Sequence, residues 1–260
     1  MKRFGLIGHP IAHSLSPALF KAGYDGRYPY ELIETADFEE AYERFLEGYD
    51  GINVTAPFKE LAFAKAEILT DECKTIGATN LLVKTPEGIK AYNSDYLGVR
   101  MWLKEVAECP ESTVSNIYKG LSVLIVGLGG AGKAAAAAAE SLGMKVIRLN
   151  RTIKDETTRP LDDFRECFRE ADIIIYNIPT AIPALNELAD NDFTPWKPKF
   201  IMEANYKNPS FDEAFINRMK EANPLAEYTG GKTWLLYQAV TGYEIFTGEK
   251  PDLQKMSAVL

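Results

Sequence analysis

Short apolar runs alternate with longer amphipathic stretches along nearly the whole chain, and this alternation predicts an α/β protein with parallel sheets. Each run has the length of a buried strand and ends in polar or turn-forming residues. In the first half the pattern predicts strands at Phe4–Gly8, Tyr30–Glu34, Gly51–Thr55, Asn80–Lys84 and Ile89–Tyr92.

Helices are predicted between these strands. One begins at Pro17 with Ser16 as its N-cap, because a serine side chain can accept a free backbone N–H at a helix start. The run Asp37-Phe38-Glu39-Glu40 resembles a capping box and opens an amphipathic helix to about Glu47. Two more helices are predicted, from Pro57 through Ile68 and from Ser94 onward.

The alternation restarts after a polar, turn-rich stretch at Glu108–Lys119, which is the predicted domain boundary. An alanine-rich helix is predicted at Ala131–Leu142, and its run of small side chains indicates close packing on a sheet. The remaining elements are strands at Ser122–Val126, Lys145–Leu149, Asp172–Tyr176 and Phe200–Glu203, and final helices at Thr233–Phe246 and Leu253–Leu260.

Composition narrows the class of protein without identifying it. The 260 residues are 46% hydrophobic and 25% charged, which is typical of a soluble globular protein of one large domain or two modest ones. A net charge of −8 argues against a nucleic-acid binder, because such proteins normally carry a basic face.

The cysteines and the termini exclude several other classes. Cys73, Cys109 and Cys167 are widely separated and show no zinc-ligand spacing, so we expect no metal site and a reducing cytoplasm. Lys2-Arg3 is followed by glycines and prolines rather than an apolar core, which argues against a signal peptide. No stretch is long and apolar enough to span a bilayer.

The sequence G-L-G-G-A-G at Gly127–Gly132 matches the dinucleotide fingerprint G-x-G-x-x-G, between a predicted strand and a helix of small residues. Gly127 would form the tight turn, Gly129 would let the backbone approach a pyrophosphate, and Gly132 would let helix and strand pack closely. The alternative is that these glycines serve only the steric needs of a strand–helix turn.

The next predicted strand ends in Asn150-Arg151-Thr152, where an NAD site usually has an acidic residue for the ribose hydroxyl. Without that carboxylate a 2′-phosphate is not repelled, and Arg151 offers it a planar, permanent charge. The sequence therefore favours NADP over NAD, with a solvated surface arginine as the alternative.

The most informative stretch is G-I-N-V-T-A-P-F-K at Gly51–Lys59. A buried strand there would bring Asn53, Thr55 and Lys59 to the rim of a sheet, where ligands of open α/β sheets bind, and Pro57 would start a helix. The alternative is an ordinary strand–helix corner with a surface lysine. Since the chain has only two histidines, we expect acid–base chemistry to rest on lysine, carboxylate or tyrosine.

Other polar residues of the first half also fall at predicted strand ends or loops. Most are neutral donors and acceptors, which suits a ligand with several hydroxyl groups better than one with phosphates. The full set of candidates is Ser14, Ser16, Asn53, Thr55, Lys59, Asn80, Asn93 and Asp95.

These motifs carry a resemblance to the shikimate dehydrogenase family that runs over nearly the whole chain. Seven segments match in order: G-H-P-I-A-H-S-L-S-P at Gly8–Pro17, N-V-T-A-P-F-K at Asn53–Lys59, G-A-T-N at Gly77–Asn80, N-S-D at Asn93–Asp95, G-L-G-G-A-G, N-R-T and Y-Q-A at Tyr237–Ala239.

The resemblance implies two domains with the active site in the cleft between them. An N-terminal α/β substrate domain with a mostly parallel sheet would comprise residues 1–105 and 233–260, and a Rossmann-like NADP-binding domain residues 106–232. The implied activity is NADP-dependent interconversion of 3-dehydroshikimate and shikimate in aromatic amino acid (chorismate) biosynthesis. The protein would be cytoplasmic, a monomer or homodimer, with no nucleic-acid or membrane partner.

The resemblance also implies residue roles. Lys59 would be the acid–base residue, with Asp95 as its catalytic partner. The substrate carboxylate would bind Ser14, Ser16 and Tyr206, and its hydroxyls Thr55, Asn80, Asp95 and Gln238. The cofactor would be lined by Asp71, Gly127, Leu128, Gly129, Gly130, Ala131, the stretch Asn150–Asp155 with Asn150, Arg151 and Thr152, and by Ala204 and Gly231.

The chain departs from the family pattern at Tyr96, Asn177–Ile182, Glu203 and Gly230–Trp234, most of which belong to the nicotinamide end. Two alternatives follow: a quinate/shikimate dehydrogenase, or a non-catalytic dinucleotide-binding regulatory protein. The N-R-T segment weighs against an NAD-preferring quinate enzyme, and the presence of both Lys59 and Asp95 weighs against a non-catalytic one. Which of these two residues holds the transferred proton is open at this level.

Overall fold

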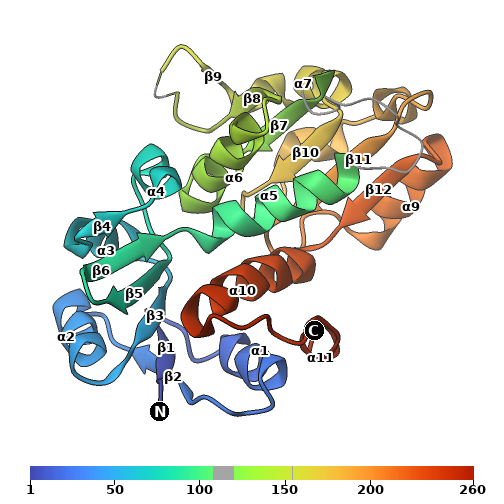
Figure 1. Ribbon diagram of the computed structural model, residues 1–260. Coiled ribbons are helices and arrows are strands. Elements are labelled where there is room, and N and C mark those ends of the chain that lie inside the picture. The colour runs from blue at the N-terminus through green and yellow to red at the C-terminus, as the bar shows by residue number, and fades with distance from the viewer. Residues whose placement is uncertain (108–119, 154) are drawn as a thin grey trace. The chain divides into compact units, whose positions relative to one another are not determined.

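The computed structural model describes residues 1–107, 120–153 and 155–260 (Figure 1). The predicted boundary at 108–119, together with Cys109 and Lys154, lies outside the described residues. Contacts divide the chain into a first unit, Met1–Gly98 with Leu236–Leu260, and a second unit, Val99–Leu235. These limits fall inside helices α5 (Ser94–Ala107) and α10 (Gly231–Thr247). The limits expected from the sequence, 105/106 and 232/233, stay a prediction.

The first unit contains one six-stranded sheet in the order β2-β1-β3-β5-β6-β4. Its strands are β1 (Phe4–Gly8), β2 (Tyr30–Glu34), β3 (Gly51–Val54), β4 (Ile68–Leu69), β5 (Leu81–Thr85) and β6 (Gly88–Tyr92). Strand β1 runs parallel to β2 and β3, whereas β5 is antiparallel to both β3 and β6. The sheet is mixed because Thr85 and Gly88 are paired, and so short a connection can join only antiparallel strands.

Helices cover both faces of this sheet. On one face, Ile7, Ile33 and Ile52 pack against α2 (Phe38–Gly48) and α3 (Lys59–Lys65). The other face packs against α1 (Ser16–Gly23) and the C-terminal half of α10, where Phe246 stacks on Phe4 with ring centroids 4.9 Å apart. In Figure 1, α1 and α2 lie on opposite sides of β1 to β3. The short helix α11 (Leu253–Ser257) contacts α1, and α4 (Asp71–Ile76) lies near β6.

The second unit contains a fully parallel sheet in the order β12-β11-β10-β7-β8-β9. Its strands are β7 (Ser122–Val126), β8 (Lys145–Leu149), β9 (Thr158–Arg159), β10 (Ile173–Tyr176), β11 (Lys199–Glu203) and β12 (Ala226–Thr229). Numbered within the unit, this is the 3-2-1-4-5-6 order of dinucleotide-binding folds, with the strand order reversing between β7 and β10. The Rossmann-like fold expected from the Gly-rich turn is confirmed.

The strands of this sheet alternate their side chains between two helical layers. Leu124 and Val126 belong to an apolar cluster with Phe164 and Phe168 of α7 (Phe164–Glu170), α8 (Pro183–Asn186) and α9 (Glu213–Ala222). The buried alanines of α6 (Gly130–Ser141) contact β7, β8 and β10. The close packing predicted for the alanine run is therefore present. The described residues of this unit also include 3₁₀ turns at Leu161–Asp163 and Asp190–Phe193.

Several local predictions are wrong at helix starts. Ser16 is not the N-cap of α1: it is the first helical residue, Leu15 precedes it, and the Ser16 backbone N–H donates to Ser14 Oγ at 3.2 Å. The helix predicted from Pro57 through Ile68 begins at Lys59 and ends at Lys65. The delay has a local cause, since Phe58 N–H closes a turn on the carbonyl of Thr55 at 3.0 Å. Helices α4, α7, α8 and α9 and strands β4, β9 and β12 were not anticipated.

Candidate functional site

Two charged residues of the first unit form a direct pair. Lys59 is the first residue of α3, and Asp95 is the second residue of α5. Lys59 Nζ donates to Asp95 Oδ2 at 2.6 Å, and the side chains are only 23% and 8% exposed. Lys59 is therefore not a solvated surface lysine. A short ion pair with limited solvent access can hold and pass a proton.

Asn80 and Gln238 meet at Ser94, the first residue of α5. The backbone N–H of Ser94 donates to Asn80 Oδ1 at 2.7 Å, and its hydroxyl donates to Gln238 Oε1 at 3.1 Å. Asn80 also stands beside the end of β3, since Val54 N–H donates to the Asn80 carbonyl at 2.8 Å. The structure thus joins residues that are more than 140 positions apart in the sequence through one serine.

Ser14 and Ser16 form a second polar group, with Ser14 in the loop after β1 and Ser16 at the first position of α1. Ser14 Oγ and Ser16 Oγ are 3.1 Å apart, and Tyr243 of α10 donates its hydroxyl to the Ser16 carbonyl at 3.1 Å. Thr55 follows β3, and its backbone N–H bonds to Ile7 at 3.0 Å. A side chain at Gly8 would collide with the Thr55 methyl group, so this glycine makes room for Thr55.

Tyr30, which the sequence did not single out as a candidate, holds Asn53 in place. Tyr30 donates its hydroxyl to Asn53 Oδ1 at 2.7 Å, and the Asn53 amide lies 3.4 Å from the Asn80 carbonyl. Burial raises the pKa of Tyr30 well above its ordinary value, so its proton stays available for the bond to Asn53. The sequence signal that could have found it is modest: a tyrosine that opens β2, a strand separated from β3, which bears Asn53, by β1 alone.

The Gly-rich turn of the second unit fits a dinucleotide. Gly127 has a left-handed φ of 89°, and a Cβ at Gly132 would collide with the Gly127 carbonyl oxygen. A Cβ at Gly129 would meet no atom within 4 Å, so open space lies where a phosphate group would approach the backbone. The Asn177 side-chain oxygen is buried without a hydrogen-bond partner among the described residues, close to Gly127 and Gly132.

Asn150, Arg151 and Thr152 follow β8 beside this turn. Asn150 Oδ1 accepts the N–H of Leu128 at 3.2 Å, and its amide donates to the Thr152 carbonyl at 2.9 Å. Asn150 therefore ties the segment bearing Arg151 to the Gly-rich turn. Arg151 is exposed, and Asp155 nearby accepts the N–H of Thr157 at 2.9 Å.

Ala204 and Tyr206 lie in the loop after β11, and Gly231 packs against the backbone of that loop. Glu203, one of the departures from the family pattern, is fully buried below it. Its carboxylate accepts the N–H of Ser210 at 2.5 Å and the Tyr228 hydroxyl at 2.8 Å. The longer acidic side chain thus has a defined structural role in holding the loop. Burial raises the pKa of Tyr206 above its ordinary value.

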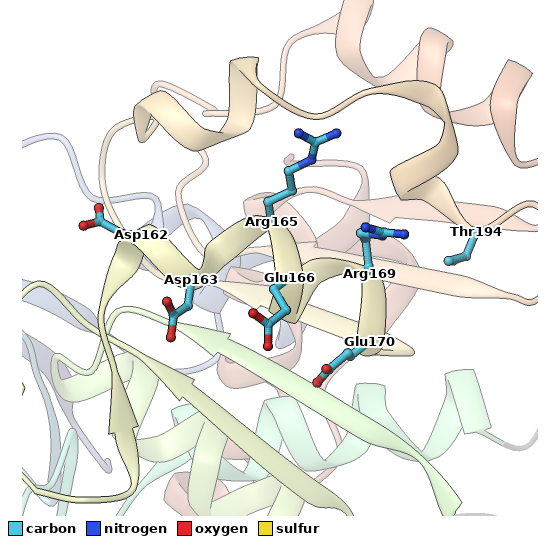
Figure 2. A pocket seen from close by; sticks show the side chains of 7 residues that line it. All are labelled: Asp162, Asp163, Arg165, Glu166, Arg169, Glu170 and Thr194. Carbon is cyan, nitrogen blue, oxygen red and sulfur yellow. The ribbon is translucent and has the colours of Figure 1, made fainter.

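Two features lie apart from these groups. Asp71 begins α4 and is almost fully exposed, paired with Lys74 at 3.1 Å. Figure 2 shows a pocket of about 840 Å³ on the second unit, lined by Asp162, Asp163, Arg165, Glu166, Arg169, Glu170 and Thr194. None of the predicted site residues lines it. Its arginines are held by Asp192, which accepts Arg165 Nε at 2.9 Å.

Within residues 1–107, 120–153 and 155–260, no cluster of three or more histidine, cysteine or acidic side chains is arranged to hold a metal ion. Over the same ranges, no helix has the length and apolar character that crossing a bilayer requires.

Comparisons with known proteins agree with this arrangement. Residues 6–82 match the shikimate dehydrogenase substrate binding domain, and residues 94–201 match the NAD binding domain of D-isomer specific 2-hydroxyacid dehydrogenases. The shikimate dehydrogenase (NADP(+)) of Caldanaerobacter subterraneus is 30% identical, with 95% of this chain and 92% of the relative covered. That of Carboxydothermus hydrogenoformans is 29% identical over all of this chain and 96% of its own.

Solved structures of related dehydrogenases share the fold of this chain over nearly its whole length. The shikimate 5-dehydrogenase of Thermus thermophilus in complex with NADP(H) and shikimate superposes with a TM-score of 0.78 at 25% identity, covering 100% of this chain and 98% of its own. A quinate dehydrogenase from Corynebacterium glutamicum in complex with NAD shares the fold, with a TM-score of 0.78 at 21% identity, covering 99% of this chain and 98% of its own.

Proposed function

Because the chain belongs to the shikimate dehydrogenase family, we propose that it catalyses the reversible, NADP-dependent reduction of 3-dehydroshikimate to shikimate. The reaction is a step of aromatic amino acid (chorismate) biosynthesis. The observation that carries this proposal is the Lys59–Asp95 pair at 2.6 Å, in the same unit as hydroxyl and amide groups suited to a polyhydroxylated ring.

The substrate side of the proposal assigns one task to each group. Ser14 and Ser16, with Tyr206, bind the carboxylate. Thr55, Asn80, Asp95 and Gln238 bind the ring hydroxyls. Together these side chains fix the orientation of the ring, so that its reacting hydroxyl lies at the Lys59–Asp95 pair.

The acid–base step follows from the bond changes. Oxidation removes a hydride from a ring carbon and a proton from the hydroxyl oxygen on that carbon. NADP⁺, when bound, supplies the hydride acceptor. The Lys59–Asp95 pair receives the hydroxyl proton, and in the reverse direction it donates a proton to the carbonyl oxygen. We assign the transferred proton to Lys59, with Asp95 holding the amine in place.

The cofactor side rests on the fit of the Gly-rich turn. The N–H groups at the start of α6 and the open space at Gly129 accommodate the pyrophosphate. Arg151 binds the 2′-phosphate, and Asn150, Thr152, Ala204 and Gly231 line the remaining surface. We assign Asp71 to the nicotinamide end on the family resemblance alone.

The test is formation of NADPH by the purified protein with shikimate, with quinate as the comparison substrate. We expect turnover of shikimate with NADP and a lower kcat/KM for quinate, whose extra hydroxyl must fit a site for a flatter ring. No change in absorbance with either cofactor, from folded protein, would refute the proposal. A higher kcat/KM for quinate would instead assign the protein to the quinate enzymes.

We also propose that the enzyme acts in the cytoplasm as a monomer or homodimer. Cys73 and Cys167 are buried free thiols, as a reducing compartment allows. Cell fractionation and size-exclusion chromatography with light scattering test the two statements separately.

A further inference from the structure

Ser94 forms hydrogen bonds with the side-chain amides of two residues of the first unit, Asn80 and Gln238. It is fully buried at the start of α5, with Asn80 on one side and Gln238 on the other. Its backbone N–H can only donate a hydrogen bond, so the Asn80 atom 2.7 Å away must be the side-chain oxygen. The amide orientation of Asn80 is thereby fixed.

The Ser94 hydroxyl fixes the second amide. It has a single proton and two acceptors within reach, Gln238 Oε1 at 3.1 Å and Asn80 Oδ1 at 3.3 Å. Since the backbone N–H already satisfies Asn80 at the shorter distance, the hydroxyl proton belongs to Gln238. In the described part of the chain, the –NH2 groups of Asn80 and Gln238 have no protein hydrogen-bond partner.

The packing of two helices makes this geometry possible. A Cβ at Gly98 of α5 would lie 2.6 Å from the Gln238 backbone nitrogen, so only glycine lets α5 approach α10 this closely. One turn along each helix, a Cβ at Gly242 would lie 3.2 Å from Ser94 Cβ. The short serine side chain can reach Gln238 only because both glycines lack side chains.

We propose that Ser94 is a positioning residue that orients Asn80 and Gln238 so that each presents its –NH2 group to an oxygen atom of the substrate. The inference rests on the proposed function, since it assumes a hydroxylated ring at this site. It specifies the direction of the hydrogen bonds to the substrate. Because both amides donate, the substrate atoms that they contact must be hydrogen-bond acceptors.

The test measures shikimate binding by calorimetry in Ser94→Ala, Ser94→Thr and Gln238→Ala, with turnover recorded in parallel. Loss of one hydrogen bond that holds Gln238 should weaken shikimate binding about tenfold in Ser94→Ala. Ser94→Thr keeps the hydroxyl that donates to Gln238 and adds a single methyl group, so the folded variant should bind shikimate like the wild type. NADP affinity should be the same in all variants.

A double-mutant cycle separates positioning from packing. If the hydroxyl acts through Gln238, Ser94→Ala should have little further effect in a Gln238→Ala background. The matched control is Thr241→Val on the same helix, whose hydroxyl bonds only to the carbonyls of Tyr237 and Gln238, at 3.0 and 3.2 Å. This control should bind shikimate normally.

Three results would overturn the proposal: unchanged affinity in Ser94→Ala, failure of Ser94→Thr to retain binding while folded, or additive losses in the double mutant. If the wild type binds shikimate but does not turn it over, the proposed function is refuted, and the shikimate affinities of the Ser94 variants still test the role of Ser94. Absence of shikimate binding by the folded wild type would overturn both.

Discussion

Lys59 and Asp95 lie 36 positions apart in the sequence and become a pair only because α3 and α5 begin at neighbouring points. If Lys59 transfers the proton, Lys59→Ala should lower kcat by roughly 10²–10⁴-fold, the usual contribution of a positioned acid or base. The KM for shikimate should change much less, because the hydroxyl and amide groups still hold the ring. Steady-state kinetics at saturating NADP measures both. A kcat of Lys59→Ala close to that of the wild type would show that Lys59 does not transfer the proton.

Asp95→Asn is the companion variant. It keeps the shape and one hydrogen-bonding oxygen but removes the negative charge next to Lys59 Nζ. We expect a large loss of kcat if the two residues act as a unit, and a loss in the double variant no greater than in Lys59→Ala alone. Additive losses would show that Asp95 acts independently, through substrate binding.

Arg151 is the residue that we expect to distinguish NADP from NAD. Arg151→Ala should weaken NADP binding by about 1.5–3 kcal/mol, the usual contribution of a hydrogen bond to a charged group, with little effect on NAD. Arg148→Ala is the matched control, because Arg148 lies within β8, just before Arg151 in the sequence, and pairs with Glu140. Equal losses for the two cofactors in Arg151→Ala would show that it does not bind the 2′-phosphate.

At the scale of elements, two glycines of the turn between β7 and α6 should differ in their effects on NADP binding and on protein stability. Gly132→Ala should lower both thermal stability and NADP affinity, because the added methyl group collides with the Gly127 carbonyl and displaces α6. Gly129→Ala should lower NADP affinity alone, since its methyl group enters open space at a φ of −71° that alanine adopts freely. Thermal melting and NADP titration of the two variants test the difference; equal melting temperatures would contradict it.

A buried lysine of β11 donates hydrogen bonds to carbonyl groups at the C-terminal end of α7. Lys199 of β11 has no solvent exposure and donates to the carbonyls of Phe168 and Ala171 at 2.7 and 2.6 Å. Burial, followed by the repulsion of Lys197, lowers the pKa of Lys199 to about 7 from its ordinary value of 10.5. Between these two values the unfolded chain binds more protons than the folded one, so stability attributable to this residue rises with pH.

The effect can be isolated with Lys199→Met. The stability of the wild type relative to this variant should be flat below pH 7 and rise above it by up to about 1.4 kcal/mol per pH unit. Urea unfolding between pH 6 and about 8.5 suits the test, below the range in which buried cysteines and tyrosines titrate. A difference that stays constant over this interval would show that Lys199 keeps its ordinary pKa.

At the scale of the whole molecule, the proposed substrate and cofactor residues divide between the two units, with Tyr206 and Asp71 as the exceptions. Lys59 and Arg151 belong to different units. We therefore expect Lys59→Ala to leave the Kd for NADP within about twofold of wild type, and Arg151→Ala to do the same for shikimate. Calorimetric titrations with single ligands test this. A tenfold crossed effect would reveal coupling between the units.

Most strands were predictable because their signal is local. Phe4–Gly8, Tyr30–Glu34 and Lys145–Leu149 are observed with the predicted limits, since each is a short stretch with an apolar centre that lies between polar or turn-forming residues. Helix starts were less predictable. Ser16 has the chemistry of an N-cap, yet whether it caps depends on where the preceding loop places it. Short elements such as β4 and β9 have two residues each and no periodicity to detect.

The α/β class, the dinucleotide turn and the identity of the chemical groups could be predicted from local sequence, because apolar periodicity and glycine spacing act over a few neighbouring residues. Which of those groups meet depends on how the whole chain packs. Ser94 stands in the sequence between two more conspicuous residues, Asn93 and Asp95. Its bonds to Asn80 and Gln238 arise from a strand end and a distant helix that approaches at two glycines, and long-range packing of that kind leaves no mark in any short stretch of sequence.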